Sequence, residues 1–162
     1  MQRVQLPNGH EMDMEIVRHP GGAAVACVDP QQRICLLRHY RCVVNDWLWE
    51  LPAGKLDQGE QPLSTAKREL QEEAGVQAQQ WQALGHVVSS PGVFTERVYL
   101  YLATELSQVS ANRDIDEVFE LHWIPFDEAL KWAVEGQLVD AKTIVGIMRA
   151  NAMLKAVITD TE

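Results

Sequence analysis

The chain has 162 residues and a formal net charge of −9, from 14 Lys and Arg against 23 Asp and Glu. Hydrophobic residues make up 46% of the chain and charged residues 23%, which is typical of a folded globular protein and unlike a disordered one. The acidic excess argues against a broad basic surface that binds nucleic acid or anionic lipid. We therefore expect one domain over residues 1–162, with no nucleic-acid or membrane partner.

Residues 1–20 are polar and lack the apolar core of a signal peptide, and no run approaches the ~20 apolar residues of a membrane helix. Cys27, Cys35 and Cys42 are odd in number and form no paired motif. We interpret the two that lie in apolar runs as buried, reduced thiols. These features predict a cytoplasmic location.

The first third of the chain contains short apolar runs bounded by turn signals, which predict strands. These expected strands cover residues 15–19, 23–28, 34–37 and 47–51. The second and third form a hairpin around the loop 29–32, and Pro52 ends the fourth.

A helix is predicted from Pro62 to Ala74, because proline is tolerated in a first turn and Gly75 is a natural stop. Its apolar stripe has helical spacing and consists of Leu63, Ala66, Leu70 and Ala74.

The rest of the chain predicts three more strands and then two helices, the second of them capped by Asp140. The strands cover residues 84–89, 98–103 and 118–124, and the helices cover 127–135 and 141–156. This order of elements is typical of an α+β or mixed α/β domain.

Glu69 and Glu73 lie four residues apart on the predicted helix, so they point in nearly the same direction. A like-charged pair at this spacing costs the helix about 0.2–0.5 kcal/mol in water, whereas a hard cation such as Mg²⁺ reverses the sign of the interaction. Glu72 points farther round, toward Arg68, with which it can form an ion pair. A solvated acidic face is the alternative to a metal site.

The motif around this helix resembles the box of the Nudix hydrolases at every specified position of residues 54–76. The matching residues are Gly54, Glu60, Arg68, Glu69, Leu70, Glu72, Glu73, Gly75 and Val76. The resemblance implies an α/β/α sandwich with a mixed β-sheet between helices, in which the box forms a loop, helix and loop. It also implies Mg²⁺-dependent hydrolysis of a nucleoside diphosphate linked to another moiety.

Motifs outside the box resemble the branch of ADP-ribose pyrophosphatases and nucleoside-diphosphate-sugar hydrolases. They are Arg38-His39-Tyr40-Arg41, Glu50 to Gly54, Ser90-Pro91-Gly92, Thr95-Glu96-Arg97 and residues 139–143. In this family a proline 15 residues after the box, here Pro91, is associated with ADP-ribose hydrolysis.

The resemblance implies that Glu69, Glu73 and the backbone carbonyl of Ala53 bind two or three Mg²⁺ ions, with Mn²⁺ as an alternative. Glu72 then supports the site through Arg68 or through water. Glu117 is implied as a metal ligand or general base, with Asp114 and Asp116 as neighbouring candidates and Glu96 as a rival base.

Substrate contacts are implied for Arg38, Tyr40, Arg41, Glu50 and Pro91. Each has a structural alternative: Arg41 clamps a phosphate or forms a salt bridge, and Tyr40 and Trp49 stack on a base or pack in the core. We interpret His19, His86 and His122 as structural residues.

We expect hydrolysis of ADP-ribose to AMP and ribose 5-phosphate. The alternatives are GDP-mannose or another sugar nucleotide as substrate, and a Nudix-fold module that binds a nucleotide without cleaving it. Relatives in this branch are often homodimers that exchange N-terminal strands, so we expect residues 1–20 to reach a partner.

Overall fold

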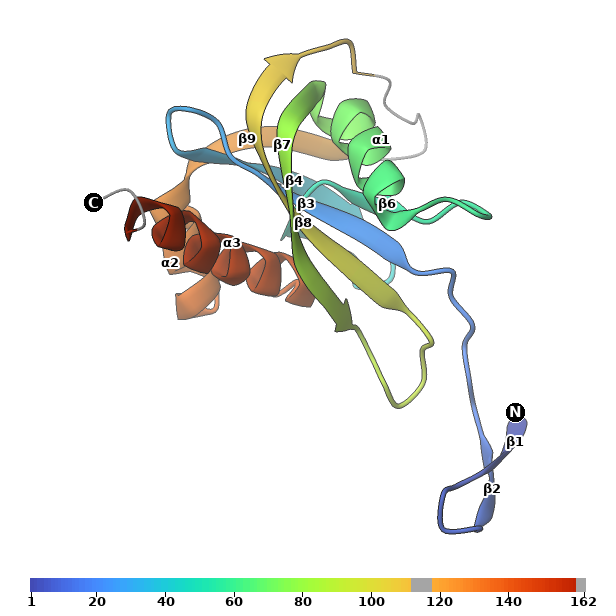
Figure 1. Ribbon diagram of the computed structural model, residues 1–162. Coiled ribbons are helices and arrows are strands. Elements are labelled where there is room, and N and C mark those ends of the chain that lie inside the picture. Colours follow the sequence, from blue (N-terminus) through green and yellow to red (C-terminus); the bar gives the residue numbers. More distant parts are fainter. Residues whose placement is uncertain (112–117, 160–162) are drawn as a thin grey trace.

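Strand β3 (Gly22–Cys27) is the centre of the fold, and every one of its residues is buried. We describe it in a computed structural model of the protein, which covers residues 1–111 and 118–159 (Figure 1). The other strands are β1 (Gln2–Gln5), β2 (Glu11–Met14), β4 (Arg33–Arg41), β5 (Asp46–Glu50), β6 (Ala53–Lys55), β7 (Val76–Val88), β8 (Arg97–Gln108) and β9 (Phe119–Pro125). The helices are α1 (Pro62–Ala74), α2 (Phe126–Glu135) and α3 (Ala141–Thr159).

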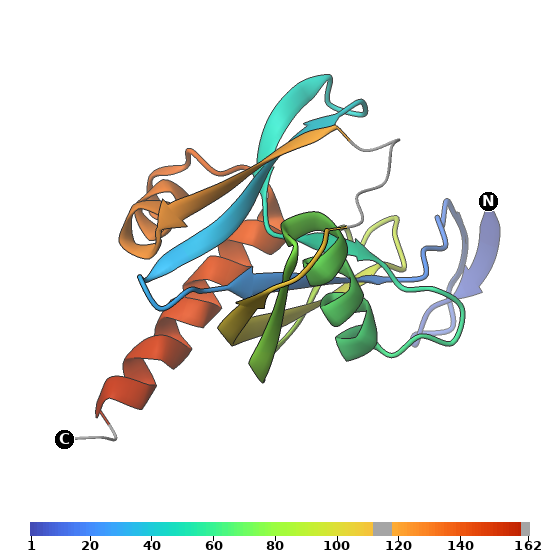
Figure 2. The same ribbon diagram turned by 90° about the horizontal axis from the view of Figure 1, so that it is seen from above.

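A four-stranded mixed sheet in the order β6-β3-β8-β7 contains β3, which runs parallel to β8 and antiparallel to β6. Figure 2 shows β3 between α1 and α3. Alternate residues of a strand face opposite sides, so Val25 packs in one hydrophobic cluster with Leu70 of α1, and Ala26 packs in the other with Ile147 of α3. Burial on both faces explains the continuous small apolar run of β3. The expected α+β sandwich is confirmed.

A second, three-stranded sheet in the order β5-β4-β9 carries α2 at its edge. Trp49 of β5 packs against the hydrophobic cluster of α3, with its ring centroid 5.5 Å from that of Trp132 and 5.0 Å from that of His122. Core packing, one of the two alternatives for Trp49, is therefore its observed environment.

Helix α1 has the predicted bounds. Proline occupies its first turn, and Gly75 ends it with a φ of 65°, where the Gly75 N–H donates to the Gln71 carbonyl at 3.0 Å. A left-handed residue at this position is the usual helix end and favours glycine. The proline and the glycine were sufficient to predict the bounds of α1, because each acts within one or two helical turns.

Some strand predictions differ from the structure. Residues 15–19 contain only a single bridge, between Val17 and Phe94, and β7 begins at Val76 instead of residue 84. The polar segment that opens β7 forms a strand because it pairs with β8, which itself extends to Gln108. The short strand β6 was not predicted, since it is defined by its pairing with β3.

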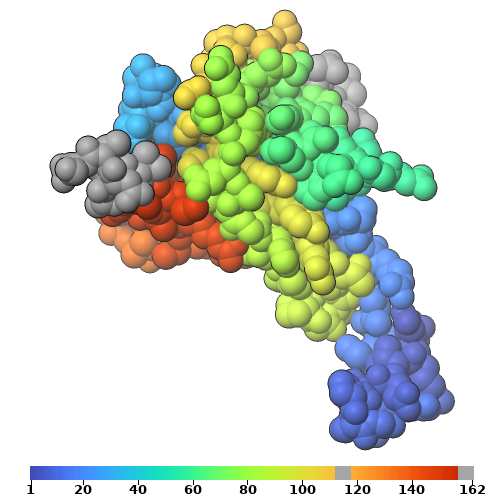
Figure 3. Space-filling model, in the orientation of Figure 1, coloured from blue at the N-terminus to red at the C-terminus, as the bar shows by residue number. Residues whose placement is uncertain are grey.

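The β1–β2 hairpin projects from the body of the molecule, as the space-filling view shows (Figure 3). Its strands pair from Gln2–Met14 to Gln5–Glu11. The guanidinium of Arg18 donates to the Gln2 side chain at 2.9 Å where the hairpin meets the body. Within the described residues, every helix is too short or too polar to cross a membrane.

Candidate active site

A cavity of about 680 Å³ opens between the box, the start of α3 and the end of β7. Four of the residues predicted for the site line it, namely Ala53, Glu69, Arg41 and Glu96. His19, Arg68 and Lys142 also line the cavity, although the sequence had given them no role in contact with substrate.

The cavity is lined by equal numbers of cationic and acidic side chains. The cationic ones are Arg41, Lys55, Arg68 and Lys142, and the acidic ones are Asp57, Glu69, Glu96 and Asp140. A site with both signs can bind an anionic group on one wall and hold a cation on another.

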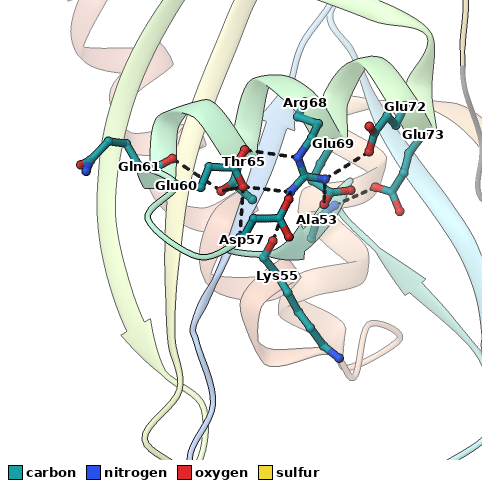
Figure 4. A network of polar contacts seen from close by, with 10 residues as sticks. All are labelled: Ala53, Lys55, Asp57, Glu60, Gln61, Thr65, Arg68, Glu69, Glu72 and Glu73. Carbon is teal, nitrogen blue, oxygen red and sulfur yellow. Dashed lines mark hydrogen bonds and ion pairs between the residues drawn. The ribbon is translucent and has the colours of Figure 1, made fainter.

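Glu69 and Glu73 both point from α1 toward β6 (Figure 4). Glu69 is 9% exposed and Glu73 is 3% exposed, so neither belongs to a solvated acidic face. The Ala53 N–H donates to Glu73 Oε2 at 2.8 Å, and a Cβ atom added at Gly54 would overlap the Glu69 carboxylate. The box glycine therefore leaves room for the Glu69 carboxylate beside the β6 backbone.

Arg68 donates hydrogen bonds to several acidic residues of the box. Its Nη1 donates to Glu69 Oε1 at 2.6 Å and to Glu72 Oε2 at 3.1 Å, which confirms the predicted contact with Glu72. Its Nε and Nη2 donate to the two carboxylate oxygens of Glu60 at 3.2 and 3.0 Å. The sequence placed Glu60 in the motif without a role, and the structure gives it the function of orienting Arg68.

These contacts shift the pKa of both partners. The hydrogen bonds from Arg68, and then that from Thr65, lower the pKa of Glu60 to about 2. The hydrogen bond to Glu60 raises the pKa of Arg68 above its ordinary value, against a smaller opposing effect of burial. Glu60 and Arg68 therefore both stay charged at any physiological pH.

Arg41 and Glu50 form a paired contact at another wall of the cavity. Arg41 Nε and Nη2 donate to the two oxygens of Glu50 at 2.7 and 2.8 Å, and Lys142 Nζ donates to Glu50 Oε2 at 2.6 Å. Glu50 is only 2% exposed, so it lies behind the two cations and orients them. Residues from β4, β5 and α3 meet here, which no sequence spacing could reveal.

Burial by itself would raise the pKa of Glu50, but hydrogen bonds from Arg41 and the charge of Lys142 lower it to about 2. Burial also disfavours the imidazolium form of His39, and with the charge of Arg41 it lowers the pKa of that ring. This wall is therefore built from an ionised carboxylate between two cations, beside a histidine whose charged form is disfavoured.

Lys142 belongs to the first turn of α3. Its ammonium also lies 3.0 Å from Asp140, whose carboxylate accepts hydrogen bonds from the Thr143 N–H at 3.0 Å and the Thr143 hydroxyl at 2.6 Å. The predicted helix cap at Asp140 is confirmed by these contacts.

Four residues predicted for substrate binding lie outside the described lining of the cavity: Glu50, which lies behind Arg41, and Arg38, Tyr40 and Pro91. The Tyr40 hydroxyl donates to Asn45 at 2.7 Å, and the Arg38 guanidinium lies 5.5 Å from the centre of the Trp47 ring. Pro91 is exposed in the loop between β7 and β8. Their roles in substrate binding stay predictions.

His19 is one of the cavity residues to which sequence analysis assigned no role at the site. Its Nδ1 lies 3.2 Å from Glu96 Oε1, and the Gly21 N–H donates to the same nitrogen at 3.1 Å. The signal that could have drawn attention to it is its position just before Gly21 and Gly22, which allow close backbone approach at the start of β3.

Asp114, Asp116 and Glu117, the loop candidates for the general base, lie outside the described residues. Among residues 1–111 and 118–159, no group of three or more His, Cys, Asp or Glu side chains is arranged to hold a metal ion. The described donors at the box are carboxylate and carbonyl oxygens, which suit a hard cation such as Mg²⁺ that keeps waters and binds substrate phosphate. The carboxylates of Glu69 and Glu73 are therefore of the chemical type that fits a divalent ion.

Comparison with known proteins gives a consistent family. The chain matches the model of the NUDIX domain over residues 18–143. It is 40% identical to a methanol dehydrogenase activator of Bacillus methanolicus, covering 89% of this chain and 79% of that protein. It is 38% identical to an ADP-ribose pyrophosphatase of Bacillus subtilis (strain 168), covering 91% of this chain and 80% of that protein.

A solved structure described as an ADP compounds hydrolase superposes with a TM-score of 0.80, covering 95% of this chain and 84% of that chain. At 22% identity this likeness concerns the fold alone. The fold, the complete box motif and the family match agree, and the chain belongs to the NUDIX family.

Proposed function

We propose that this protein is a Mg²⁺-dependent pyrophosphatase that hydrolyses ADP-ribose to AMP and ribose 5-phosphate. The observation that carries the proposal is the pair of buried carboxylates, Glu69 and Glu73, that face β6 beside a cavity with cationic residues on another wall. Similarity to an ADP-ribose pyrophosphatase of Bacillus subtilis supports the choice of substrate.

Glu69, Glu73 and the carbonyl of Ala53 hold the metal, two or three ions in all, in this proposal. Ions held there would supply charge neutralisation for the phosphates and a more acidic water for attack on phosphorus. Glu72 has a supporting role, because it shares Arg68 with Glu69 and so limits the movement of that guanidinium.

Arg41 binds a phosphate of the substrate, because a guanidinium presents paired donors that match phosphate oxygens. Glu50 positions Arg41 from behind, and Arg38, Tyr40 and Pro91 are the further candidates for contact with the substrate. The general base is Glu117 or Asp116, which precede β9 in the sequence, or Glu96 at the cavity wall.

The protein acts in the cytoplasm in this proposal, since Cys27, Cys35 and Cys42 are all free thiols. We also infer a homodimer in which the projecting β1–β2 hairpin packs on the partner. No residue of the hairpin belongs to either described hydrophobic cluster, so the hairpin does not pack into the core of its own chain.

An activity panel tests the proposed function. The purified protein is incubated with ADP-ribose, GDP-mannose, UDP-glucose or dGTP, each with Mg²⁺, with Mn²⁺ and with EDTA. We expect the highest kcat/KM for ADP-ribose, with AMP as product, and no turnover in EDTA. Preference for GDP-mannose would replace the substrate assignment, and tight binding of ADP-ribose without cleavage would make the protein a sensor.

Two variants connect that activity to the box. Glu69→Gln and Glu73→Gln keep the shape of the side chain but remove its charge, and each should lower kcat by about 10²-fold or more while the protein stays folded. The matched control is Glu128→Gln, an exposed acid in the first turn of α2. Normal metal-dependent turnover in both box variants would contradict the assignment.

A further inference from the structure

Lys142, the second residue of α3, is held at the cavity wall by two carboxylates. Its Nζ donates to Glu50 Oε2 at 2.6 Å and lies 3.0 Å from Asp140 Oδ1. Its side chain is 18% exposed, so most of it is covered by protein while part can still be reached from the cavity. Fixing a lysine side chain costs rotamer entropy. For Lys142 this cost arises on folding rather than on binding.

The two carboxylates are themselves fixed, because the end of β5 packs on the first turns of α3. Asp140 accepts hydrogen bonds from the N–H and the hydroxyl of Thr143, and the Leu51 N–H donates to the same hydroxyl oxygen at 2.9 Å. A Cβ atom added at Gly146 would lie 2.5 Å from Leu51 Cδ1, so the helix and this segment approach each other closely. The strand end and the helix start therefore set where Glu50 and Asp140 lie.

The ammonium of Lys142 has a donor left for a ligand. An ammonium carries three N–H groups, and within residues 1–111 and 118–159 Glu50 and Asp140 engage at most two of them. Glu50 lies outside the described lining of the cavity, whereas Arg41, Asp140 and Lys142 belong to it. This wall therefore presents two positive charges and one negative charge to a ligand, which favours an anion.

Arg68, another cation of the cavity, is committed to the box (Figure 4). A guanidinium has five N–H donors. Arg68 donates twice to Glu60 and once each to Glu69, Glu72 and the Lys55 carbonyl, which accounts for all of them. The Lys55 side chain is exposed, so holding it against a ligand costs rotamer freedom. The remaining cations of the described cavity lie at the other wall, where β5 meets α3.

We propose that Lys142 binds a phosphate of the substrate beside Arg41, and that Glu50 is the positioning residue that sets both cations against that phosphate. That the phosphate belongs to ADP-ribose rests on the proposed function. Arg41 and Lys142 both donate to the Glu50 carboxylate, Arg41 through paired contacts at 2.7 and 2.8 Å, so the two positive charges lie next to each other. Charged donors of this kind form strong hydrogen bonds with phosphate oxygens.

The wall of Lys142 is connected to the box by a short piece of chain. Ala53 follows Glu50 by three residues, a stretch of at most about 11 Å. The Ala53 N–H donates to Glu73, so this segment joins Glu50 to the acidic pair of the box. A molecule with two neighbouring phosphates can therefore place one at Lys142 and the other at the box, where the proposed function has the divalent ions.

The first experiment measures binding without metal and without turnover. Calorimetric titrations in EDTA use the two expected products, AMP and ribose 5-phosphate, and adenosine as a probe that lacks the phosphate. We expect the wild type to bind at least one of the two products, and Lys142→Met to weaken that binding about tenfold or more, the size of one hydrogen bond to a charged group. Adenosine binding should not change. The product that loses affinity shows which half of the substrate Lys142 holds.

Two further variants are matched to Lys142→Met. Lys142→Arg keeps the positive charge and the donors, so it should recover most of the lost affinity. Lys131→Met removes a lysine of α2 that lies outside the described cavity lining, with a side chain 66% exposed and its Nζ 3.9 Å from Glu135, and it should bind both products as the wild type does. Unchanged affinity for both products in Lys142→Met would overturn the proposal, and so would an equal loss in Lys131→Met.

The second experiment separates binding from chemistry in the hydrolysis of ADP-ribose. A phosphate contact that is present in both the ground state and the transition state affects KM more than kcat. Lys142→Met should therefore raise KM about tenfold or more and lower kcat by less than about threefold, and Lys142→Arg should restore KM. The Mg²⁺ concentration for half-maximal rate should stay at its wild-type value. A fall in kcat with KM unchanged would overturn the contact between Lys142 and the substrate.

Thermal unfolding checks the fold of each variant, because Lys142→Met leaves the buried Glu50 carboxylate with one cation fewer. Glu50→Gln, alone and combined with Lys142→Met, gives a second comparison in which that carboxylate is absent. The double variant should bind the phosphate less tightly than Glu50→Gln, and equal affinity would overturn the contact. If the wild type binds a product through Lys142 but cleaves no nucleoside diphosphate sugar, the proposed function fails and the binding site stands. If the wild type binds neither product in EDTA, the site fails whatever the activity.

Discussion

Glu50 illustrates how a nearly buried carboxylate remains ionised. Its pKa is about 2 because two cations from different elements, Arg41 and Lys142, outweigh the burial that opposes the charge. The ordinary value is 4.5, so the folded state binds the proton more weakly than the unfolded state. Ionised Glu50 therefore stabilises the fold above pH 4.5, and this stabilisation is lost as the pH falls toward about 2.

Glu50→Gln should lower the free energy of unfolding at pH 7 by roughly 3 kcal/mol, the size expected for a pKa shift of this order and for breaking a buried ion pair. Urea unfolding at a series of pH values measures this. The difference from the wild type should shrink between pH 4.5 and about 2. Asp13→Asn, which breaks the exposed pair with Arg3, should change stability little at any pH. A constant difference down to acid pH would contradict the linkage.

The sequence predicts the side-chain directions on α1 far better than it predicts which residues contact Glu50. The directions of Glu69, Glu72 and Glu73 follow from one helical repeat, and the structure has Glu72 at Arg68 as expected. Arg41 and Lys142 come from elements separated by about two thirds of the chain, and their meeting depends on how α3 packs against the sheets. Only the folded chain brings them to one carboxylate.

At the scale of elements, the contact between β6 and α1 decides where the carboxylates of Glu69 and Glu73 lie. The strand has only three residues, and two of them meet the acids of the helix: Ala53 donates to Glu73, and Gly54 makes space for Glu69. β3 fixes the other edge of β6, since a Cβ at Gly22 would lie 2.8 Å from the Gly54 carbonyl oxygen. The position of the helix is thus set by close backbone packing.

Gly54→Ala tests this packing. The added methyl group overlaps the Glu69 carboxylate, so either β6 or the side chain must move, and we expect a loss of activity of at least about 10²-fold. The same substitution at Gly92, where a Cβ meets no atom within 4 Å, should leave activity at the wild-type level. Equal activity of the two variants would show that the site tolerates displacement of Glu69.

Strand boundaries were harder to predict than helix boundaries. Pro62 marks the start of α1 and Gly75 marks its end, whereas the first half of β7 is polar and lies outside the predicted strand. It is a strand because Val76 to Ala78 pair with Gln108 to Leu106 of β8. Pairing with a strand distant in sequence determines whether such a segment is a strand, so its own composition does not predict it.

At the scale of the whole molecule, the β1–β2 hairpin projects from the body, and contacts within one chain do not explain its position. Light scattering should give twice the mass of the chain if the proposed dimer forms. Deletion of residues 1–14 should give a monomer with an unchanged circular dichroism spectrum, because both hydrophobic clusters lie elsewhere. A monomeric full-length protein, or a dimer that survives the deletion, would remove the hairpin from the interface.

The balanced charges of the cavity have a consequence for how fast an anionic substrate arrives. At a distance the substrate meets a protein of net charge −9, which repels it, and only near the cavity does it meet Arg41, Lys55, Arg68 and Lys142. Added salt screens the distant repulsion more than the short contacts inside. Encounter with a nucleotide should therefore quicken at moderate ionic strength, opposite to the slowing seen where attraction steers the ligand.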